Sequence, residues 1–274
     1  MKLLFKEIAS KCFKPTEARV QKLEKWIHQS ELARRTGNLE PYPNQYDKAE
    51  ELITFYTFAP FFLSSNQAEL TNKVLKLAGI PVDVDSVVSA GLERLMSPPQ
   101  GYLAWMQEQV NSHPVRYIRK QAVSRKNENK PLEAPTHVDA FIETESLLIL
   151  FEMKFTSDIS IQTTFNPYRN QLARLIDVGI SDALKKRKRL VLLLCSPSVF
   201  FVSRSRLYSY KITEYSDYEE VKRDIGWRGK EQIEESVLAV AWIPLKSLVE
   251  IMYEDFNHAD LGDALLFFKE RNLA

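Results

Sequence analysis

Apolar residues in the first third of the chain recur every three or four positions, which is the spacing of one face of an α-helix. In the first of these stretches Val20, Leu23 and Ile27 share a face, and Gly37 follows as a stop signal. The same spacing continues along the chain, and we expect helices over residues 16–36, 46–58, 67–77 and 84–96. Residues 1–96 are therefore predicted to form a helical N-terminal region.

The pattern changes after Ser97. One more helix should follow and end before Pro114, because the residue before a proline disfavours helical geometry. A later helix is expected to begin with Asn166 as its N-cap and Pro167 at its first position, to end at Gly179, and to be followed by a short basic helix. Apolar and β-branched runs predict strands over residues 115–126, 138–143 and 147–155, from 190, and over 237–243.

This order of elements is one helix, three strands, a helix, a strand, and a later strand followed by C-terminal helices. It predicts an α/β fold over residues 97–274, in which a mixed central β-sheet is flanked by helices. The aromatic cluster between Phe55 and Phe62 is interpreted as core of the helical region. The basic run from Lys185 to Arg189 is interpreted as the exposed end of a helix, where cations suit the helix dipole.

Composition adds three constraints. The chain has 274 residues, of which 45% are hydrophobic and 27% charged, as is ordinary for a soluble globular protein. The formal charge of +1 hides a basic middle third, because residues 97–189 carry 14 Lys and Arg against 10 Asp and Glu, which suits a polyanionic partner. Charges near the N-terminus, two distant cysteines (Cys12 and Cys195) and scattered histidines predict a cytoplasmic protein with reduced thiols and no structural zinc site.

Candidate chemistry lies where two predicted strands end. The apolar run from Leu147 to Phe151 opens directly into Glu152-Met153-Lys154, and Asp139 lies on the neighbouring strand. Side chains alternate along a strand, so Glu152 and Lys154 should share a face. Burying a carboxylate and an ammonium costs several kcal/mol unless each finds a partner. Two adjacent carboxylates repel each other, but a divalent cation such as Mg²⁺ uses them as oxygen ligands.

The pattern Val138-Asp139 followed by Glu152-Met153-Lys154 resembles the PD-(D/E)XK, or restriction-endonuclease-like, nuclease superfamily, over roughly residues 100–195. Val138 replaces the proline of the family name. The resemblance implies a restriction-endonuclease-like mixed sheet and a Mg²⁺ (or Mn²⁺) site. Asp139, Glu152 and the backbone carbonyl of Met153 would bind the metal, and Lys154 would assist the attack of water.

The helix that follows the motif offers further candidates. On a helical wheel, Gln171 and Arg174 flank the apolar arc, and we expect them to reach the metal-bound water or a substrate phosphate. Arg169, in the same segment, is a predicted substrate-binding residue. Many members of the superfamily also supply an acid from the helix before the first strand. Glu108 is the obvious candidate, but it lies off the apolar face of its helix and is interpreted as solvated.

Three functions fit these residues. The first is a Mg²⁺-dependent nuclease acting on DNA, with no membrane partner and with a homodimer as a possible assembly. The second is a nucleic-acid-binding module that has a nuclease fold but no turnover. The third is a structural α/β protein in which Glu152 and Lys154 form only an ion pair, since charged networks perturb buried groups outside active sites as well.

Overall fold

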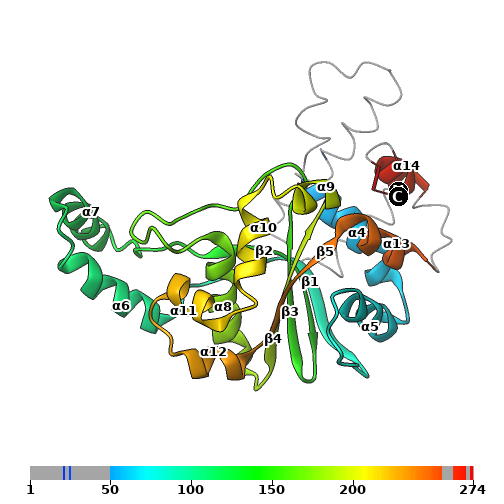
Figure 1. Cartoon of the computed structure of the whole chain (residues 1–274), viewed down its shortest axis with the longest axis horizontal. Coiled ribbons are helices and arrows are strands. Elements are labelled where there is room, and N and C mark those ends of the chain that lie inside the picture. The colour runs from blue at the N-terminus through cyan, green and yellow to red at the C-terminus, as the bar shows by residue number, and fades with distance from the viewer. Residues whose placement is uncertain (1–20, 22–24, 26–49, 255–261, 270–271, 274) are drawn as a thin grey trace, which may run out of the picture.

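A computed structural model describes residues 21, 25, 50–254, 262–269 and 272–273 of the chain (Figure 1). Apart from residues 21 and 25, the helix predicted over residues 16–36 lies outside the described residues, as do the start of the one predicted over 46–58 and Cys12. None of the helices in the described ranges is both long and apolar enough to cross a membrane.

The centre of the fold is a mixed five-stranded β-sheet flanked by helices, so the predicted α/β fold class is confirmed. The strands lie in chain order across the sheet, β1-β2-β3-β4-β5. β2 pairs antiparallel with both β1 and β3, and β3, β4 and β5 are parallel. Their bounds are Val87–Met96 for β1, Thr136–Thr144 for β2, Leu147–Met153 for β3, Arg189–Ser196 for β4 and Val237–Pro244 for β5.

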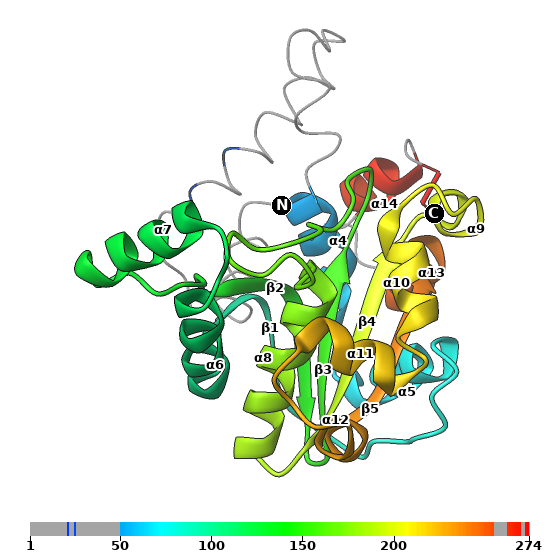
Figure 2. The same cartoon turned by 60° about the vertical axis from the view of Figure 1, so that its left-hand side comes forward.

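Helices cover both faces of this sheet (Figures 1 and 2). One apolar core joins the sheet to the N-terminal helices and to the last two helices of the chain, namely α4 (Glu50–Leu63), α5 (Gln67–Leu77), α13 (Leu245–Tyr253) and α14 (Gly262–Lys269). The other core lies under α8 (Gln171–Lys185), α10 (Leu207–Glu214), α11 (Tyr218–Ile225) and α12 (Lys230–Ser236). The short helix α9 (Ser198–Val202) follows β4.

The aromatic cluster of α4 is core, as predicted. The side chains from Phe55 to Phe62 are buried, and the ring of Phe58 meets that of Phe151 in β3 at a centroid distance of 4.9 Å. Cys195 is also buried, in β4. The N-terminal helices therefore attach to the same sheet that carries the candidate motif.

Two predicted elements are wrong. Residues 84–96 were expected to be helical, but β1 pairs along its length with β2, from Val87 opposite Thr144 to Met96 opposite Thr136. The apolar residues that suggested one helical face do not share a buried side, since Leu92 is 6% exposed and Leu95 is 56% exposed. The last part of the predicted helical region thus belongs to the sheet.

The stretch from Val115 to Lys126 was expected to be a strand and is instead the helix α7 (Arg116–Asn127). Its β-branched residues favoured a strand, but α7 packs on α6 (Gln100–Asn111) and buries Ala122 there. The two helices form a hairpin that projects from the body of the molecule (Figure 2). Hydrogen bonding within the helix satisfies the backbone groups of these residues.

The start of α8 also differs from the prediction. Asn170, not Asn166, is the N-cap, and its side chain accepts hydrogen bonds from the backbone N–H groups of Leu172 (3.0 Å) and Ala173 (3.1 Å). Asn166 instead closes a turn by accepting from the N–H of Tyr168. The helix continues past Gly179 to Lys185, so the predicted short basic helix is its last turn.

An ion-pair cluster joins the end of α8 to the end of β2. Glu143 accepts hydrogen bonds from Lys186 (2.6 Å) and Lys188 (2.9 Å), and Arg94 of β1 lies 3.8 Å away. Burial alone would raise the pKa of Glu143, but the two lysines outweigh that effect and lower the pKa below its ordinary value. Two members of the basic run at residues 185–189 thus have structural partners.

We expect Glu143→Gln to lower the free energy of unfolding at neutral pH by about 1–3 kcal/mol, because it leaves two lysines without their carboxylate. A lowered carboxyl pKa stabilises the fold above the unfolded-state value of about 4.3, and this contribution is lost as the pH falls through the folded-state pKa. The difference between parent and variant in urea unfolding should therefore shrink below about pH 4. A difference that is constant with pH would contradict this assignment.

Candidate active site

The candidate motif residues lie at neighbouring ends of β2 and β3. The two strands pair antiparallel with Ala140 opposite Phe151, which brings Asp139 beside Glu152. The Asp139 Oδ2 atom accepts a hydrogen bond of 2.7 Å from the backbone N–H of Met153. Strand register therefore fixes the first acid of the motif against the Glu-Met-Lys segment.

Glu152 and Lys154 meet as the alternation along a strand predicts. The Lys154 Nζ atom lies 2.7 Å from Glu152 Oε1, and the two residues are 7% and 1% exposed respectively. Gln171, the first residue of α8, donates a hydrogen bond of 2.6 Å from Nε2 to the same Glu152 oxygen. The structure thus brings together four of the predicted site residues, namely Asp139, Glu152, Lys154 and Gln171.

A third acid, Glu50, completes the cluster, and sequence reasoning missed it. It lies in the first turn of α4, and its Oε2 atom is 3.4 Å from Lys154 Nζ. Its Oε1 atom accepts hydrogen bonds from the N–H of Phe155 (3.0 Å) and the hydroxyl of Ser157 (2.5 Å). Two glutamates in the first turn of this helix are visible in the sequence, but nothing local singles out Glu50 from Glu51.

The electrostatics of this cluster are those of three carboxylates around one ammonium. Enclosure by protein atoms raises the pKa of the Asp139 carboxyl well above its ordinary range, and the nearby Glu152 raises it further. Burial likewise raises the pKa of Glu152, and the positive charge of Lys154 acts in the opposite sense. Burial alone would lower the pKa of Lys154, but the three carboxylates outweigh it and raise that pKa. An added cation would relieve this excess of negative charge.

The donor set fits a hard divalent cation in its chemistry. Asp139 and Glu152 offer carboxylate oxygens next to the Met153 backbone, and the buried Glu152 Oε2 atom has no hydrogen-bond partner within the described part of the chain. Carboxylate and carbonyl oxygens are the ligands that Mg²⁺ prefers. Among the described residues, no three His, Cys, Asp or Glu side chains are already grouped closely enough to hold a metal ion by themselves.

Two further candidates, Arg174 and Glu108, lie in different parts of the structure. Arg174 is partly buried on α8, and its Nε atom lies 3.8 Å from Glu133 Oε1. Burial raises the pKa of the Glu152 carboxyl, and the positive charge of Arg174 opposes that rise. Glu108 is exposed on α6, as expected for a solvated residue, and α6 belongs to the projecting hairpin. The helix before the first strand is thus not the one that carries Glu108.

Arg169 was predicted to bind substrate, but the structure places it in a buried ion network. The side chain is fully buried, and its Nε atom donates to Glu133 Oε2 (2.8 Å) while one terminal nitrogen donates to Asp177 Oδ2 (2.9 Å). The guanidinium also stacks over the ring of Tyr102 at 3.6 Å from its centroid. Asp177 Oδ1 in turn accepts a hydrogen bond of 2.6 Å from Arg228 Nε. In this conformation the Arg169 side chain is not accessible from the surface.

No family model matches this chain, and comparisons with curated proteins and with solved structures also found no significant match. The class of the protein therefore follows from its own architecture. It is an α/β protein with a five-stranded mixed sheet and a buried acidic cluster around a lysine, where β3 ends next to β2 and α4.

We expect Arg169→Ala to lower the free energy of unfolding by about 3–5 kcal/mol, because it leaves Glu133 and Asp177 buried with one partner fewer. Arg169→Lys should cost less but still destabilise, since an ammonium cannot bridge both carboxylates as a planar guanidinium does. Denaturant unfolding followed by circular dichroism measures both. Lys185→Ala, which changes an exposed residue, serves as the control and should stay within about 0.5 kcal/mol of the parent. Unchanged stability of Arg169→Ala would restore a role for this residue in binding substrate.

Proposed function

We propose that the protein is a metal-dependent nuclease of the PD-(D/E)XK, or restriction-endonuclease-like, kind, which hydrolyses phosphodiester bonds of DNA. The convergence of Asp139, Glu152 and Lys154, with a buried acceptor oxygen of Glu152 that has no hydrogen bond from any described residue, carries the proposal. A purely structural ion pair does not need the second carboxylate, Asp139, beside it, because two adjacent carboxylates repel each other.

Each residue of the site would have its own role in the proposed reaction. Asp139, Glu152 and the Met153 carbonyl would hold Mg²⁺ or Mn²⁺, which when bound neutralises charge at the phosphoryl group and lowers the pKa of water. Lys154 would orient the attacking water and offset negative charge that develops in the transition state. Gln171 would keep Glu152 in position through its 2.6 Å hydrogen bond. Glu50 would hold the Lys154 ammonium, which lies 3.4 Å away.

DNA as the substrate is supported by charge. A polyanion approaching the site needs positive surface near it, and residues 97–189 have an excess of four positive charges although they include Asp139 and Glu152. Arg174, partly buried between the site and Glu133, is placed to contribute to that field. DNA and RNA share the phosphodiester chemistry, so the substrate test below includes both.

A nucleic-acid-binding module without turnover is the second candidate. It is favoured by the position of the Lys154 ammonium, which lies within 3.4 Å of carboxylate oxygens of both Glu50 and Glu152 and neutralises part of their charge without a metal. On this alternative the parent protein binds DNA without cleaving it. Asp139→Asn would then leave the salt-sensitive binding unchanged.

The direct test is cleavage of linear, circular and single-stranded DNA and of RNA, with Mg²⁺, Mn²⁺ or a chelator. We expect the parent to cleave DNA only with metal, and Lys154→Ala to be slower by about 100-fold or more, the usual contribution of a positioned proton-transfer group. Lys154→Met, which keeps the buried stem, guards against a loss that comes from misfolding. Lys73→Ala changes a lysine of α5 that pairs with Glu69 and should retain the parent rate.

Cleavage that persists in the chelator, or equal rates for parent and both Lys154 variants, would contradict the nuclease assignment. Binding of DNA without cleavage under every condition would favour the second candidate.

Glu50 allows a separate test. Glu50→Gln keeps an oxygen that can accept from Phe155 and Ser157 but removes the charge beside Lys154. Groups that position a metal site or its catalytic partner typically contribute 10–100-fold, so we expect metal-dependent cleavage to slow by about 10-fold or more. Glu69→Gln, on the exposed side of α5, is the matched control. A Glu50→Gln variant as active as the control would remove Glu50 from the proposed machinery.

A further inference from the structure

The α6–α7 hairpin carries the most one-sided charge among the described elements. The helix α7 contains five basic residues and no acidic one (Arg116, Arg119, Lys120, Arg125 and Lys126), and Lys130 follows it. Only Lys130 has a carboxylate partner, Glu128, among the described residues. A face that serves solubility alone mixes both signs of charge, so this composition needs another explanation.

The arrangement of these charges is unfavourable for the helix itself. Arg116, Arg119 and Lys120 lie in the first turns of α7, where the helix dipole disfavours cations, and no acidic residue is present in the first turn. Their spacing of three and four positions also places like charges next to one another, which destabilises a helix further. A bound polyanion removes both penalties, because it supplies negative charge along the whole face.

The exposed residues of α7 form one surface. Arg116, Lys120 and Val123 face solvent, and together with Arg119 they line one shallow hollow. Tyr117 beside them is 66% exposed, which is unusual for a ring that could pack. Arg119 also donates to the backbone carbonyls of His113 and Pro114, which holds the start of the helix. The first turn of α7, which carries the basic surface, is therefore held in place by Arg119.

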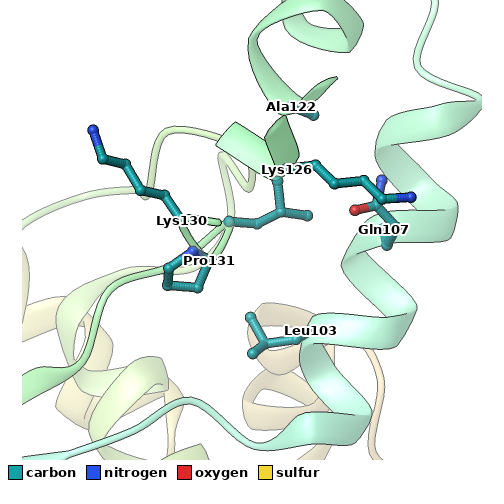
Figure 3. A pocket seen from close by; sticks show the side chains of 7 residues that line it. Leu103, Gln107, Ala122, Lys126, Lys130 and Pro131 are labelled. Carbon is teal, nitrogen blue, oxygen red and sulfur yellow. The ribbon is translucent and has the colours of Figure 1, made fainter. Parts of the chain in front are cut away.

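The other end of the hairpin carries two more lysines. Lys126 and Lys130 border a second hollow of about 160 Å³ between the two helices, with Leu103 and Gln107 of α6 on the opposite wall (Figure 3). A helix of 12 residues is about 18 Å long, and duplex DNA carries about ten phosphate charges over that length of its axis. The spread of cations along α7 matches such a target better than it matches a single small anion.

The hairpin is also tied to the segment that leaves the candidate site. Phe165, eleven residues after Lys154, packs into the small core of the hairpin with Met106 and Ala122, and Arg125 lies over its ring. At the base of α6, Gly101 leaves room for the ring of Trp227, which a Cβ atom would meet at 2.4 Å. The hairpin is thus anchored on both sides and is held in a defined place relative to Lys154.

From these observations we infer that α7 is a nucleic-acid-binding arm that grips the phosphate backbone of duplex DNA through Arg116, Arg119 and Lys120. The inference rests on the proposed function for its choice of partner, but it concerns binding and not cleavage. It assigns to this hairpin the sequence-independent part of the affinity, which phosphate contacts supply.

The test compares two double variants of the full chain that each remove one Arg and one Lys. Arg116→Ala/Lys120→Ala changes the arm, and Lys185→Ala/Arg187→Ala changes exposed residues near the start of β4, at the opposite end of the parallel strands from Lys154. Binding of a fluorescent 20-base-pair duplex is measured from 50 to 300 mM salt. Each lost phosphate contact lowers the slope of log affinity against log salt by about 0.9. We expect a slope lower by about 2 and at least about 10-fold weaker binding at 100 mM salt for the arm variant alone.

Equal binding by the two double variants would overturn the arm, even if the parent cleaves DNA. Binding of the parent to anionic lipid vesicles but not to the duplex would overturn it as well. Loss of binding in the arm variant, with no cleavage by the parent, would uphold the arm while the nuclease proposal fails. Circular dichroism checks that both double variants keep the helix content of the parent, as we expect because alanine favours helices.

Discussion

The buried ion network around Arg169 holds together parts of the molecule that no single core joins. Two guanidinium groups (Arg169 and Arg228) meet two carboxylates (Glu133 and Asp177), and each of the four residues is at most 6% exposed. The charges balance, which is the condition under which buried ions are tolerated. Tyr102 of α6 adds a hydrogen bond to Glu133 and a ring under Arg169, so the hairpin is docked onto the same network.

This network also determines the geometry of the candidate site. Arg169 directly precedes Asn170, the N-cap of α8, and Gln171, which binds Glu152. A side chain that is locked between Glu133 and Asp177 leaves the start of α8 little freedom, and sites that rest on such rigid supports hold their groups in productive positions. The residue predicted to touch substrate thus acts on the site through the backbone that it fixes.

The sequence predicted well where local pattern decides the structure. The apolar runs that became β3 and β4 are buried along nearly their whole length, and their identity follows from their composition alone. The pairing of Glu152 with Lys154 followed from alternation along one strand. The predictions failed where long-range contacts decide, because β1 forms only when β2 pairs with it, and the partners of Arg169 lie 36 residues before it and 8 after it.

Glu50 was not predicted as a site residue because the first strand was placed wrongly. Once residues 84–96 were read as a helix and residues 115–126 as the first strand, the helix before that strand had to be the one containing Glu108. With β1 at residues 87–96, the helices that precede the sheet within residues 50–86 are α4 and α5, and Glu50 opens α4. No local feature distinguishes Glu50 from Glu51, since only the contact across 104 residues with Lys154 does so.

Charge is also distributed in a way that the net value conceals. The three carboxylates of the site would repel a phosphate backbone, and Lys154 offsets only one of them. On the proposed function, a polyanion can approach only if other positive charge lies nearby, which a bound metal would supply at the reacting bond and the basic arm would supply along the rest of the strand. On that view the cations of α7, which have no carboxylate partner among the described residues, would neutralise the phosphate chain along the strand, and the buried Glu152 Oε2 atom would act at the reacting bond through the metal that it helps to bind.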